Sequence, residues 1–429
     1  MTELKGNIMP YSTFILSDEC DLQKYRDFVV KHVIEAGLSF FMEREKSAPA
    51  GYNFLNTKFN PNTGKDLPPE GFDVVYTWLL GRGAEAIYTH LNYLDKLPGL
   101  SMEFKEQASS FLKRQGGQST DAIMELFEKY SNHAPFRVDL LLNSPDAASA
   151  RDDFFFPSDI FCAKGLLASG DSKKVTVGRT VLLTCIDALF DNRFFLSRAV
   201  PHDGRFSQGG MMLALGGIPH LIATSESDVA RAEYQEVGLK LIDYVLQHHY
   251  DPDEKRFCEY VDRDGNRIDD YLDPGHALEF AGLGLQALSC CPAPASTAER
   301  IRNILDIAIT SFTLGCNPQH GGIYKSVNNR TGKSIDSNMP WWNLPEAFRA
   351  GRRGEAVCEN PEDKVALRRI ATFSSNSYFT HYLNENMSLF PFQTRSGTTG
   401  EVVDVVPAVP EGDPLYHTNL AFIDGIFNL

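Results

Sequence analysis

The feature of this 429-residue chain that most limits its fold is a recurring order of helix, turn-rich insert and second helix. Apolar residues at helical spacing mark the first helices, beginning with residues 21–46, and stretches of strand and turn character follow them. The second helices are expected to begin near residues 72, 155, 206, 274, 339 and 415. Six helix pairs with inserts on one side form either an open solenoid or a closed ring, and in both the inserts collect on one face.

The second helices favour the closed ring. They are the more apolar set and are rich in Gly, Ala and aromatic residues, as in the segment from Gln208 to Ile222, which is expected to be helical in spite of its glycines. We therefore expect an all-α chain folded as an (α/α)6 barrel of twelve helices, with short β-hairpin inserts around the mouth of a central pocket. The expected domain organisation is one catalytic barrel over residues 1–429, in which residues 1–20 form an N-terminal extension.

Charge, cysteine content and motifs exclude several classes of protein. Lys and Arg number 41 against 56 Asp and Glu, a net charge of −15, which argues against nucleic acid or an anionic membrane as a partner. The eight cysteines show no spacing of a zinc site, so we expect reduced thiols and no metal. Nucleotide-binding glycine motifs are absent, which predicts no cofactor. Without a signal pattern or a long apolar run, a cytoplasmic location is expected.

The stretch FCEYVDRDGNRIDDYLDPGHALEF, residues 257–280, joins a hairpin to the start of a second helix. Asp273 suits an N-cap and Pro274 the first helical position, which places His276 in the first turn with Glu279 on the same face. The helix dipole favours a neutral imidazole, whereas a nearby carboxylate favours the imidazolium. A titration near neutral pH is one expectation for His276, and a histidine that only caps or packs the helix end is the other.

Asp413 and Pro414 repeat this pattern before His417, so two histidines are expected to face one cavity. Other unusual residues also occur near the starts of second helices: Arg82, Asp159, Trp341, Trp342 and Glu346. Charges inside a ring are costly unless they are paired. Tryptophan faces for C–H groups, together with donors and acceptors for hydroxyls, are what a sugar pocket requires, although core packing is the alternative for each tryptophan.

Four short motifs carry a resemblance to a known family. GHALEF, PWWNLPEA, the GR pair in LLGRG and the YH pair in DPLYHTN resemble the N-acylglucosamine 2-epimerase superfamily in order and spacing, from about Tyr52 to the C-terminus. The resemblance implies an (α/α)6 barrel that interconverts sugars through an enediolate. It also implies His276 and His417 as a general acid/base pair, Glu279 as the group that tunes His276, and Arg82 and Glu346 as groups that hold substrate oxygens. By analogy it implies a homodimer.

Two departures limit what the resemblance says about substrate. Relatives acting on cellobiose, sulfoquinovose-type or mannose-type sugars resemble one another in an Asn-x-x-Met-His motif, but this chain has GGMMLAL, with Met212 in the place of the histidine. The stretch VPEGDPLYH also lacks the tryptophan of the cellobiose type. These departures favour a resemblance to the acylglucosamine epimerases.

The sequence therefore predicts a cofactor-independent sugar epimerase or isomerase that binds a small sugar and 2-epimerises an N-acylated hexosamine or a related aldose. Three alternatives stay open. One is an aldose-ketose isomerase acting on mannose or a similar sugar. Another is a glycoside hydrolase or lyase that uses carboxylates such as Asp159, Glu279 or Glu346. The last is a sugar-binding or protein-interaction module without catalysis.

Overall fold

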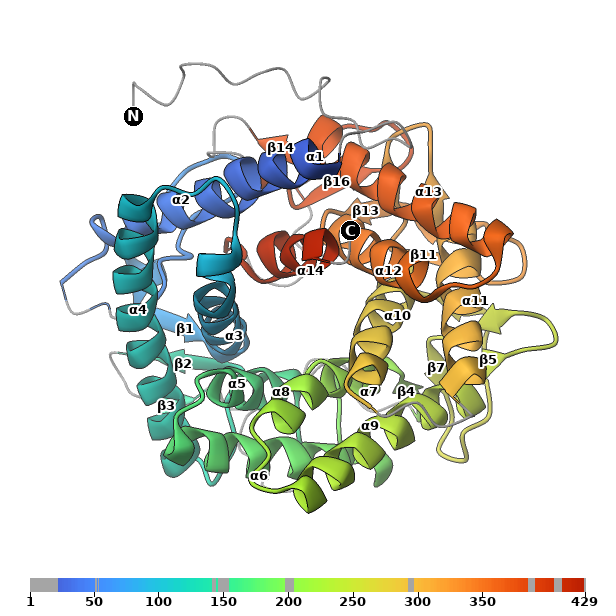
Figure 1. The fold of residues 1–429 in the computed structure, drawn as a ribbon, viewed down its shortest axis with the longest axis horizontal. Coiled ribbons are helices and arrows are strands. Elements are labelled where there is room, and N and C mark those ends of the chain that lie inside the picture. Colours follow the sequence, from blue (N-terminus) through green and yellow to red (C-terminus); the bar gives the residue numbers. More distant parts are fainter. Residues whose placement is uncertain are drawn as a thin grey trace.

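The computed structural model describes residues 22–50, 52, 54–140, 144–145, 154–196, 204–291, 297–384, 390–404 and 411–427. The expected N-terminal extension, residues 1–20, lies outside these ranges. Within them the helices form two concentric rings (Figure 1). The first helix of each expected pair belongs to the outer ring and the second helix to the inner ring.

The outer helices bury one face against the inner ring and expose the other, as α9 does by burying Tyr234, Leu241 and Val245 on one side. The first outer helix is α1 (Leu22–Val29), continued by a π-helical segment (Val30–Glu35) into α2 (Ala36–Glu45). The others are α4 (Met102–Lys129), α6 (Ser172–Phe190), α9 (Asp228–His248), α11 (Thr297–Gly315) and α13 (Pro361–Ser377), which a second π-helical segment (Tyr378–Tyr382) extends. Two single 3₁₀ turns, Pro69–Asp73 and Leu94–Lys96, flank the first inner helix.

The inner helices are shorter and almost wholly buried. They are α3 (Thr77–Tyr93), α5 (Pro157–Ala168), α7 (Gly209–Leu215) with α8 (Ile218–Ala223), α10 (Pro274–Ser289), α12 (Asn343–Val357) and a third π-helical segment (Tyr416–Leu420) continued by α14 (Ala421–Phe427). Consecutive inner helices contact one another, and the last π-helical segment contacts α3. The ring is therefore closed, and the predicted (α/α)6 barrel is confirmed. The single helix expected from Gln208 to Ile222 is instead two short helices that meet at Gly216 and Gly217.

Glycines allow α3 and α5 to pack closely. A Cβ on Gly81 would lie 2.4 Å from the carbonyl carbon of Phe161, and a Cβ on Gly165 would lie 2.8 Å from the Cβ of Ala84. A larger side chain at either position would force the two helices apart, because the interior has no free space to absorb it. The close approach brings Phe161 beside Arg82, the first of the predicted pocket residues.

Short antiparallel strands lie where the inner helices begin. They are β1 (Val74–Tyr76), β2 (Arg137–Asp139), β3 (Ser144–Pro145), β4 (Phe206–Ser207), β5 (Tyr250–Asp251), β6 (Arg256–Phe257), β7 (Tyr260–Val261), β8 (Tyr271–Leu272), β9 (Cys316–Asn317), β10 (Gly322–Ile323), β11 (Ser326–Asn328), β12 (Ser334–Asp336), β13 (Asn338–Pro340), β14 (Leu383–Asn384), β15 (Phe390–Pro391) and β16 (Thr394–Ser396). Some form local hairpins, such as β5 with β6 and β11 with β12. Others pair between successive inserts, namely β1 with β2, β4 with β7, β8 with β11 and β13 with β16. The inserts thus form a connected rim.

The two Asp-Pro pairs end up in different local structures. Asp273 caps α10 as expected, because its side chain accepts hydrogen bonds from the backbone N–H groups of Gly275 and His276 at 3.0 and 3.2 Å. Asp413 also accepts from the backbone N–H of His417, at 3.4 Å. However, Leu415 has a left-handed backbone with φ of 65°, and a π-helical segment rather than an α-helix follows it. The C-terminal histidine is therefore held in an irregular turn.

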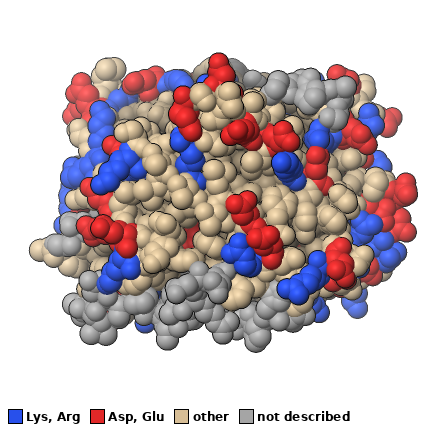
Figure 2. Space-filling model, turned by 90° about the horizontal axis from the view of Figure 1, so that it is seen from below, with Lys and Arg blue, Asp and Glu red and all other residues tan. Residues whose placement is uncertain are grey.

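Side chains of both charges share the side of the surface that Figure 2 draws. Figure 2 shows one side of the molecule, where basic and acidic side chains are interspersed rather than gathered by sign. None of the helices in the described ranges is long and apolar enough to cross a membrane. The seven cysteines in the same ranges are not joined in disulfides.

Candidate active site

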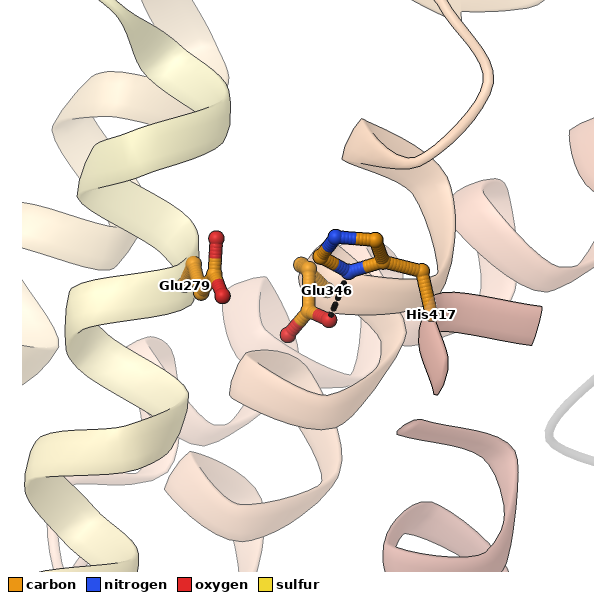
Figure 3. A group of neighbouring side chains, drawn as sticks. All are labelled: Glu279, Glu346 and His417. Carbon is orange, nitrogen blue, oxygen red and sulfur yellow. Dashed lines mark hydrogen bonds and ion pairs between the residues drawn. The ribbon is translucent and has the colours of Figure 1, made fainter. Parts of the chain in front are cut away.

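Three of the predicted residues meet inside the inner ring. Glu279 on α10, Glu346 on α12 and His417 in the last π-helical segment are all buried, and each offers an atom within 4.8 Å of the others. Figure 3 shows Glu346 and His417 joined by a hydrogen bond, with Glu279 facing them from the neighbouring helix. Residues almost 140 positions apart in the chain therefore share one site, as a closed ring requires.

His417 has the geometry of a neutral base. Its Nδ1 lies 2.8 Å from Oε1 of Glu346. Burial, and then the positive charge of Arg82, lower the pKa of His417 to about 3, so the ring is neutral at ordinary pH. Because a carboxylate only accepts hydrogen bonds, Nδ1 carries the hydrogen and Nε2 keeps its lone pair.

Glu346 receives a second hydrogen bond from its own helix. Nη1 of Arg349 donates to Oε2 of Glu346 at 2.8 Å, and both side chains are buried. Burial raises the pKa of Glu346, and Arg349 is the largest influence that lowers it. The sequence interpretation included Glu346 but not Arg349, because an arginine one turn further along a helix is ordinarily a solvent-exposed residue.

Glu279 is a buried carboxyl group whose hydrogen-bonding capacity is only partly used. Its Oε1 atom has no hydrogen-bond partner among the described residues, and burial followed by the negative charge of Glu346 raises the pKa of Glu279. A buried polar atom without a partner is costly unless a ligand or water completes its bonding. Glu279 is thus suited to a hydroxyl group of a bound molecule.

Arg82 is held by aromatic faces. The centre of its guanidinium lies 4.6 Å from the ring of Trp78, 4.3 Å from Phe161 and 5.1 Å from Tyr416. Its Nε atom is buried without a hydrogen-bond partner in the described part of the chain. Cation–π contacts position the positive charge while leaving this N–H donor for a ligand oxygen.

His276 lies in the opposite electrostatic environment. Its Nδ1 is 3.1 Å from Oε1 of Glu259 and 3.6 Å from Oδ2 of Asp273. Burial favours the neutral ring, but the carboxylates of Asp273 and Glu259 outweigh it and raise the pKa of His276 to about 9. The ring is therefore an imidazolium at neutral pH. Glu259 and Asp273, rather than the Glu279 expected from the sequence, are the carboxylates that contact Nδ1 of His276.

Glu259 is the main site residue that the sequence interpretation missed. It is 1% exposed, and it accepts hydrogen bonds from the hydroxyl of Ser207 and, at 3.3 Å, from Nε2 of Gln208. The pairing of β4 with β7 brings these residues together. The only sequence signal was the place of Glu259 in the hairpin that precedes His276.

Trp342 connects the two histidines. Its ring centre lies 5.7 Å from that of His276 and 5.6 Å from that of His417. On the side of His276, the ammonium of Lys325 lies 5.6 Å from the same indole and forms an ion pair with Asp273. Trp342 is thus placed as a flat apolar wall between an acid and a base.

Trp341 has a different role from its neighbour. It is 3% exposed, its ring centre is 5.9 Å from that of His417, and its Nε1 donates to Oε1 of Gln393 at 3.3 Å. These contacts indicate a packing residue behind His417.

Asp159 lies apart from these groups. It is fully buried, and its two oxygens accept from the backbone N–H groups of Ala134, at 2.6 Å, and Phe156, at 2.8 Å. The bond from Phe156 caps the start of α5, and the bond from Ala134 ties the preceding insert to the same helix. With both oxygens occupied by the backbone, we leave Asp159 out of the proposed site.

The donor set of Glu279, Glu346 and His417 has the residue types of a divalent-metal site. The surrounding charges fit such an ion poorly. Arg349 already neutralises Glu346, and the charge of Arg82 acts on both Glu279 and His417. A third positive centre would be repelled at this distance, so we assign the site no metal.

Comparison with known proteins places the fold and the site in context. The family model described as N-acylglucosamine 2-epimerase (GlcNAc 2-epimerase) matches residues 220–390, which include His276, Glu279 and Glu346. None of the curated protein sequences compared with the chain matches it.

Solved structures with the same fold cover nearly the whole chain. The cellobiose 2-epimerase from Bacillus thermoamylovorans has a TM-score of 0.69 at 13% identity, covering 95% of this chain and 99% of that one. A D-mannose isomerase has a TM-score of 0.66 at 13% identity, covering 94% and 98%. The unsaturated glucuronyl hydrolase from Bacillus sp. GL1 has a TM-score of 0.54 at 13% identity, covering 92% and 96%. At these identities the structures establish the fold alone.

Proposed function

We propose that this chain, a member of the N-acylglucosamine 2-epimerase superfamily, inverts the configuration of a sugar at the carbon next to its carbonyl group, without a cofactor. One observation carries the proposal. Two histidines flank one tryptophan, and their surroundings hold them in different protonation states: burial and Arg82 keep His417 neutral, whereas Asp273 and Glu259 keep His276 cationic. A two-sided proton transfer requires this combination.

In the first step, the opened sugar presents its carbonyl oxygen to Arg82. His417 removes the proton from the adjacent carbon through its free Nε2 atom. The electron pair of the broken C–H bond moves into the new C–C double bond, and negative charge develops on the carbonyl oxygen. Arg82 stabilises this charge in a site from which water is largely excluded.

In the second step, His276 donates its Nε2 proton to the same carbon from the other face, and the carbonyl group forms again. His276 ends neutral and His417 ends cationic, so solvent must restore both before the next turnover. Glu279, with its unpaired oxygen, holds a sugar hydroxyl, and the indole of Trp342 faces the C–H groups. The proposed substrate is an N-acylated hexosamine or a related aldose.

An aldose-ketose isomerase is the second candidate, since a D-mannose isomerase shares the fold. It uses the same first step, but the proton returns to the former carbonyl carbon while the hydroxyl proton of the neighbouring carbon moves to the former carbonyl oxygen, and a ketose results. A glycoside hydrolase is the third, since the carboxylates of Glu279 and Glu346 lie within 4.8 Å, near the separation of roughly 5–5.5 Å found in retaining glycosidases. Against it, Glu346 is bonded on both oxygens, to His417 and Arg349.

The deciding experiment is incubation of the full chain in heavy water with N-acetylglucosamine, N-acetylmannosamine, mannose, glucose and cellobiose, followed by proton NMR. Epimerisation gives a product with deuterium at the carbon beside the carbonyl, while the remaining substrate keeps its hydrogen early in the reaction. A ketose product identifies the isomerase, and a new reducing end identifies the hydrolase. Failure of every sugar to exchange or react would count against the proposal.

From the resemblance and the free thiols we also propose a cytoplasmic homodimer. Sedimentation equilibrium of the full chain tests the dimer, and a mass near the 47.9 kDa of one chain would contradict it.

A further inference from the structure

Arg349 is a buried cation that the two proton-transfer steps do not use. It lies on α12 and is 5% exposed. On one side Nη1 donates to Oε2 of Glu346 at 2.8 Å, and on the other Nε lies 3.6 Å from Oδ2 of Asp424 on α14. Burying a guanidinium is unfavourable unless nearby carboxylates compensate its charge. A buried arginine between two carboxylates therefore indicates a role beyond packing.

The neighbouring helix leaves space for this side chain. A Cβ on Gly282 of α10 would lie 3.0 Å from Cδ of Arg349 and 3.2 Å from its Cγ. Because real Cβ contacts are seldom so short, a glycine here lets the arginine stem pass between α10 and α12. The side chain of Arg349 therefore reaches Glu346 through the space between α10 and α12.

We propose that Arg349 is a positioning residue: it keeps Glu346 ionised and thereby fixes His417 in the tautomer whose Nε2 can accept a proton. The effect on rate rests on the function proposed above. The tautomer itself is a property of the free protein and can be measured without any substrate.

The argument follows from the two bonding states of Glu346. As a carboxylate it accepts from Nδ1 of His417, which leaves the lone pair on Nε2. Protonated, it can donate to Nδ1, and the ring hydrogen then moves to Nε2, where it blocks the base. Burial favours the protonated acid, and the positive charge 2.8 Å away opposes it.

Ionisable groups on several surrounding inner elements act on Glu346. These groups are Arg349 on its own helix, Arg82 on α3, Lys164 on α5, Glu279 on α10, His417 in the π-helical segment and Asp424 on α14. Only Arg349 among the cations donates a hydrogen bond directly to it in the described part of the chain. Arg353 pairs with Asp424 through two nitrogens and so holds in place the carboxylate on the other side of Arg349.

A matched control exists on the same helix. Arg352 donates to Glu355 at 2.5 Å, three residues away, and both side chains are mostly buried. Glu355 also pairs with Arg368 of the outer helix α13, so this pair lies on the side of α12 that faces the outer ring. Arg349→Met and Arg352→Met therefore remove the same charge from the same helix, once beside the site and once away from it.

The first measurement is ¹⁵N NMR of the full chain labelled at histidine, with His417 assigned from a His417→Gln variant. In the unaltered protein and in Arg352→Met we expect Nε2 of His417 to resonate as an unprotonated ring nitrogen across the neutral range. In Arg349→Met we expect it to shift toward the position of an N–H nitrogen. Arg349→Lys, which retains a positive charge, should keep the original signal.

If Arg349→Met does not fold, as judged by circular dichroism, Arg349→Gln removes the charge while keeping an amide at the position, and the same shift is expected. A folded, charge-free variant in which Nε2 of His417 remains unprotonated would overturn the proposal.

The second measurement is solvent exchange into sugar. With the wrong tautomer we expect the turnover of Arg349→Met to fall by roughly 10²- to 10⁴-fold with little change in KM, as for a general base deprived of its orienting partner. Arg352→Met should turn over at the original rate. If no sugar exchanges at all, the proposed function fails while the NMR measurement still tests Arg349.

Discussion

The two histidines of the pocket are the same residue type at corresponding points of the repeat, but their surroundings make His276 cationic and His417 neutral. His276 sees two carboxylates, Asp273 and Glu259, and its pKa is raised to about 9. Burial, and then the charge of Arg82, lower the pKa of His417 to about 3, and the carboxylate bonded to its Nδ1 is already paired with Arg349. The balance of neighbouring charges, not burial alone, decides the state of each ring.

This contrast explains how one chain obtains an acid and a base from a single residue type. Both rings present Nδ1 to a carboxylate, which leaves Nε2 as the reactive atom in each. The difference lies in the number and pairing of these carboxylates. The carboxylate bonded to His417 is paired with Arg349. His276 has two carboxylates, 3.1 and 3.6 Å from Nδ1, and of these Asp273 is paired with Lys325.

Removing each histidine ring in turn should have the largest effect and tests whether the two rings serve separate faces. We expect His417→Ala to lose solvent exchange at the carbon beside the carbonyl of the preferred epimer, by about 10³-fold or more. We expect His276→Ala to form product comparably slowly, yet to keep exchanging the hydrogen of that epimer, because the base is intact. Deuterium incorporation followed by NMR separates these outcomes, and equal loss of exchange in both variants contradicts the assignment of separate faces.

The next largest effect concerns the charge on His276. The ring must be protonated to donate, so activity should fall as the pH rises through about 9. In Glu259→Gln one stabilising carboxylate is lost, the pKa falls toward the ordinary value near 6.5, and the alkaline limb moves to lower pH. Near pH 8 this amounts to roughly a tenfold loss of activity.

The control for this shift is Glu254→Gln, a change of an exposed carboxylate on the same insert that pairs with Arg256 and Arg330. Its pH–rate profile should match that of the unaltered protein. An unchanged alkaline limb in Glu259→Gln would remove Glu259 from the role given to it here.

A smaller effect tests Trp342, whose indole lies between the two histidine rings. Trp342 contacts both histidines, whereas Trp341 packs against His417 in the core and donates to the side-chain oxygen of Gln393. Trp342→Phe reduces the flat surface offered to a sugar, and we expect KM to rise several-fold, roughly 1 kcal/mol of lost contact, with turnover less affected. Trp341→Phe should leave KM unchanged and lower the melting temperature, since it leaves the carbonyl of Gln393 without its partner.

Much of the fold was accessible from sequence because it depends on local pattern. The helix that opens with Asp273 and Pro274 begins where the cap and proline signals place it, at Pro274. Counting helix pairs then required a closed ring, and the ring brought His276 and His417 to one pocket. These inferences use only periodicity, helix-end chemistry and the number of repeats.

What the sequence did not predict depends on contacts between distant segments. The pairing of β4 with β7 sets Glu259 beside His276, and nothing in the local pattern of either strand specifies that partner. The position of the Arg349 side chain depends on Gly282, which lies on another helix. The protonation states follow from such neighbours: the local sequence pointed to Glu279 as the partner of His276, whereas the carboxylates that contact its Nδ1 are Glu259 and Asp273.

Asp159 provides the smallest expected effect on activity and a check on where the site ends. Its carboxylate accepts from two backbone N–H groups, those of Ala134 and Phe156. In Asp159→Asn one acceptor becomes an amide N–H₂ that faces a donor, so we expect a loss of about 1–3 kcal/mol in the free energy of unfolding. Urea titration measures this loss. Because neither oxygen is left to bind a ligand, kcat and KM of the folded variant should match the original values. A change in KM at full folding would place Asp159 in contact with the substrate and extend the pocket beyond the two histidines.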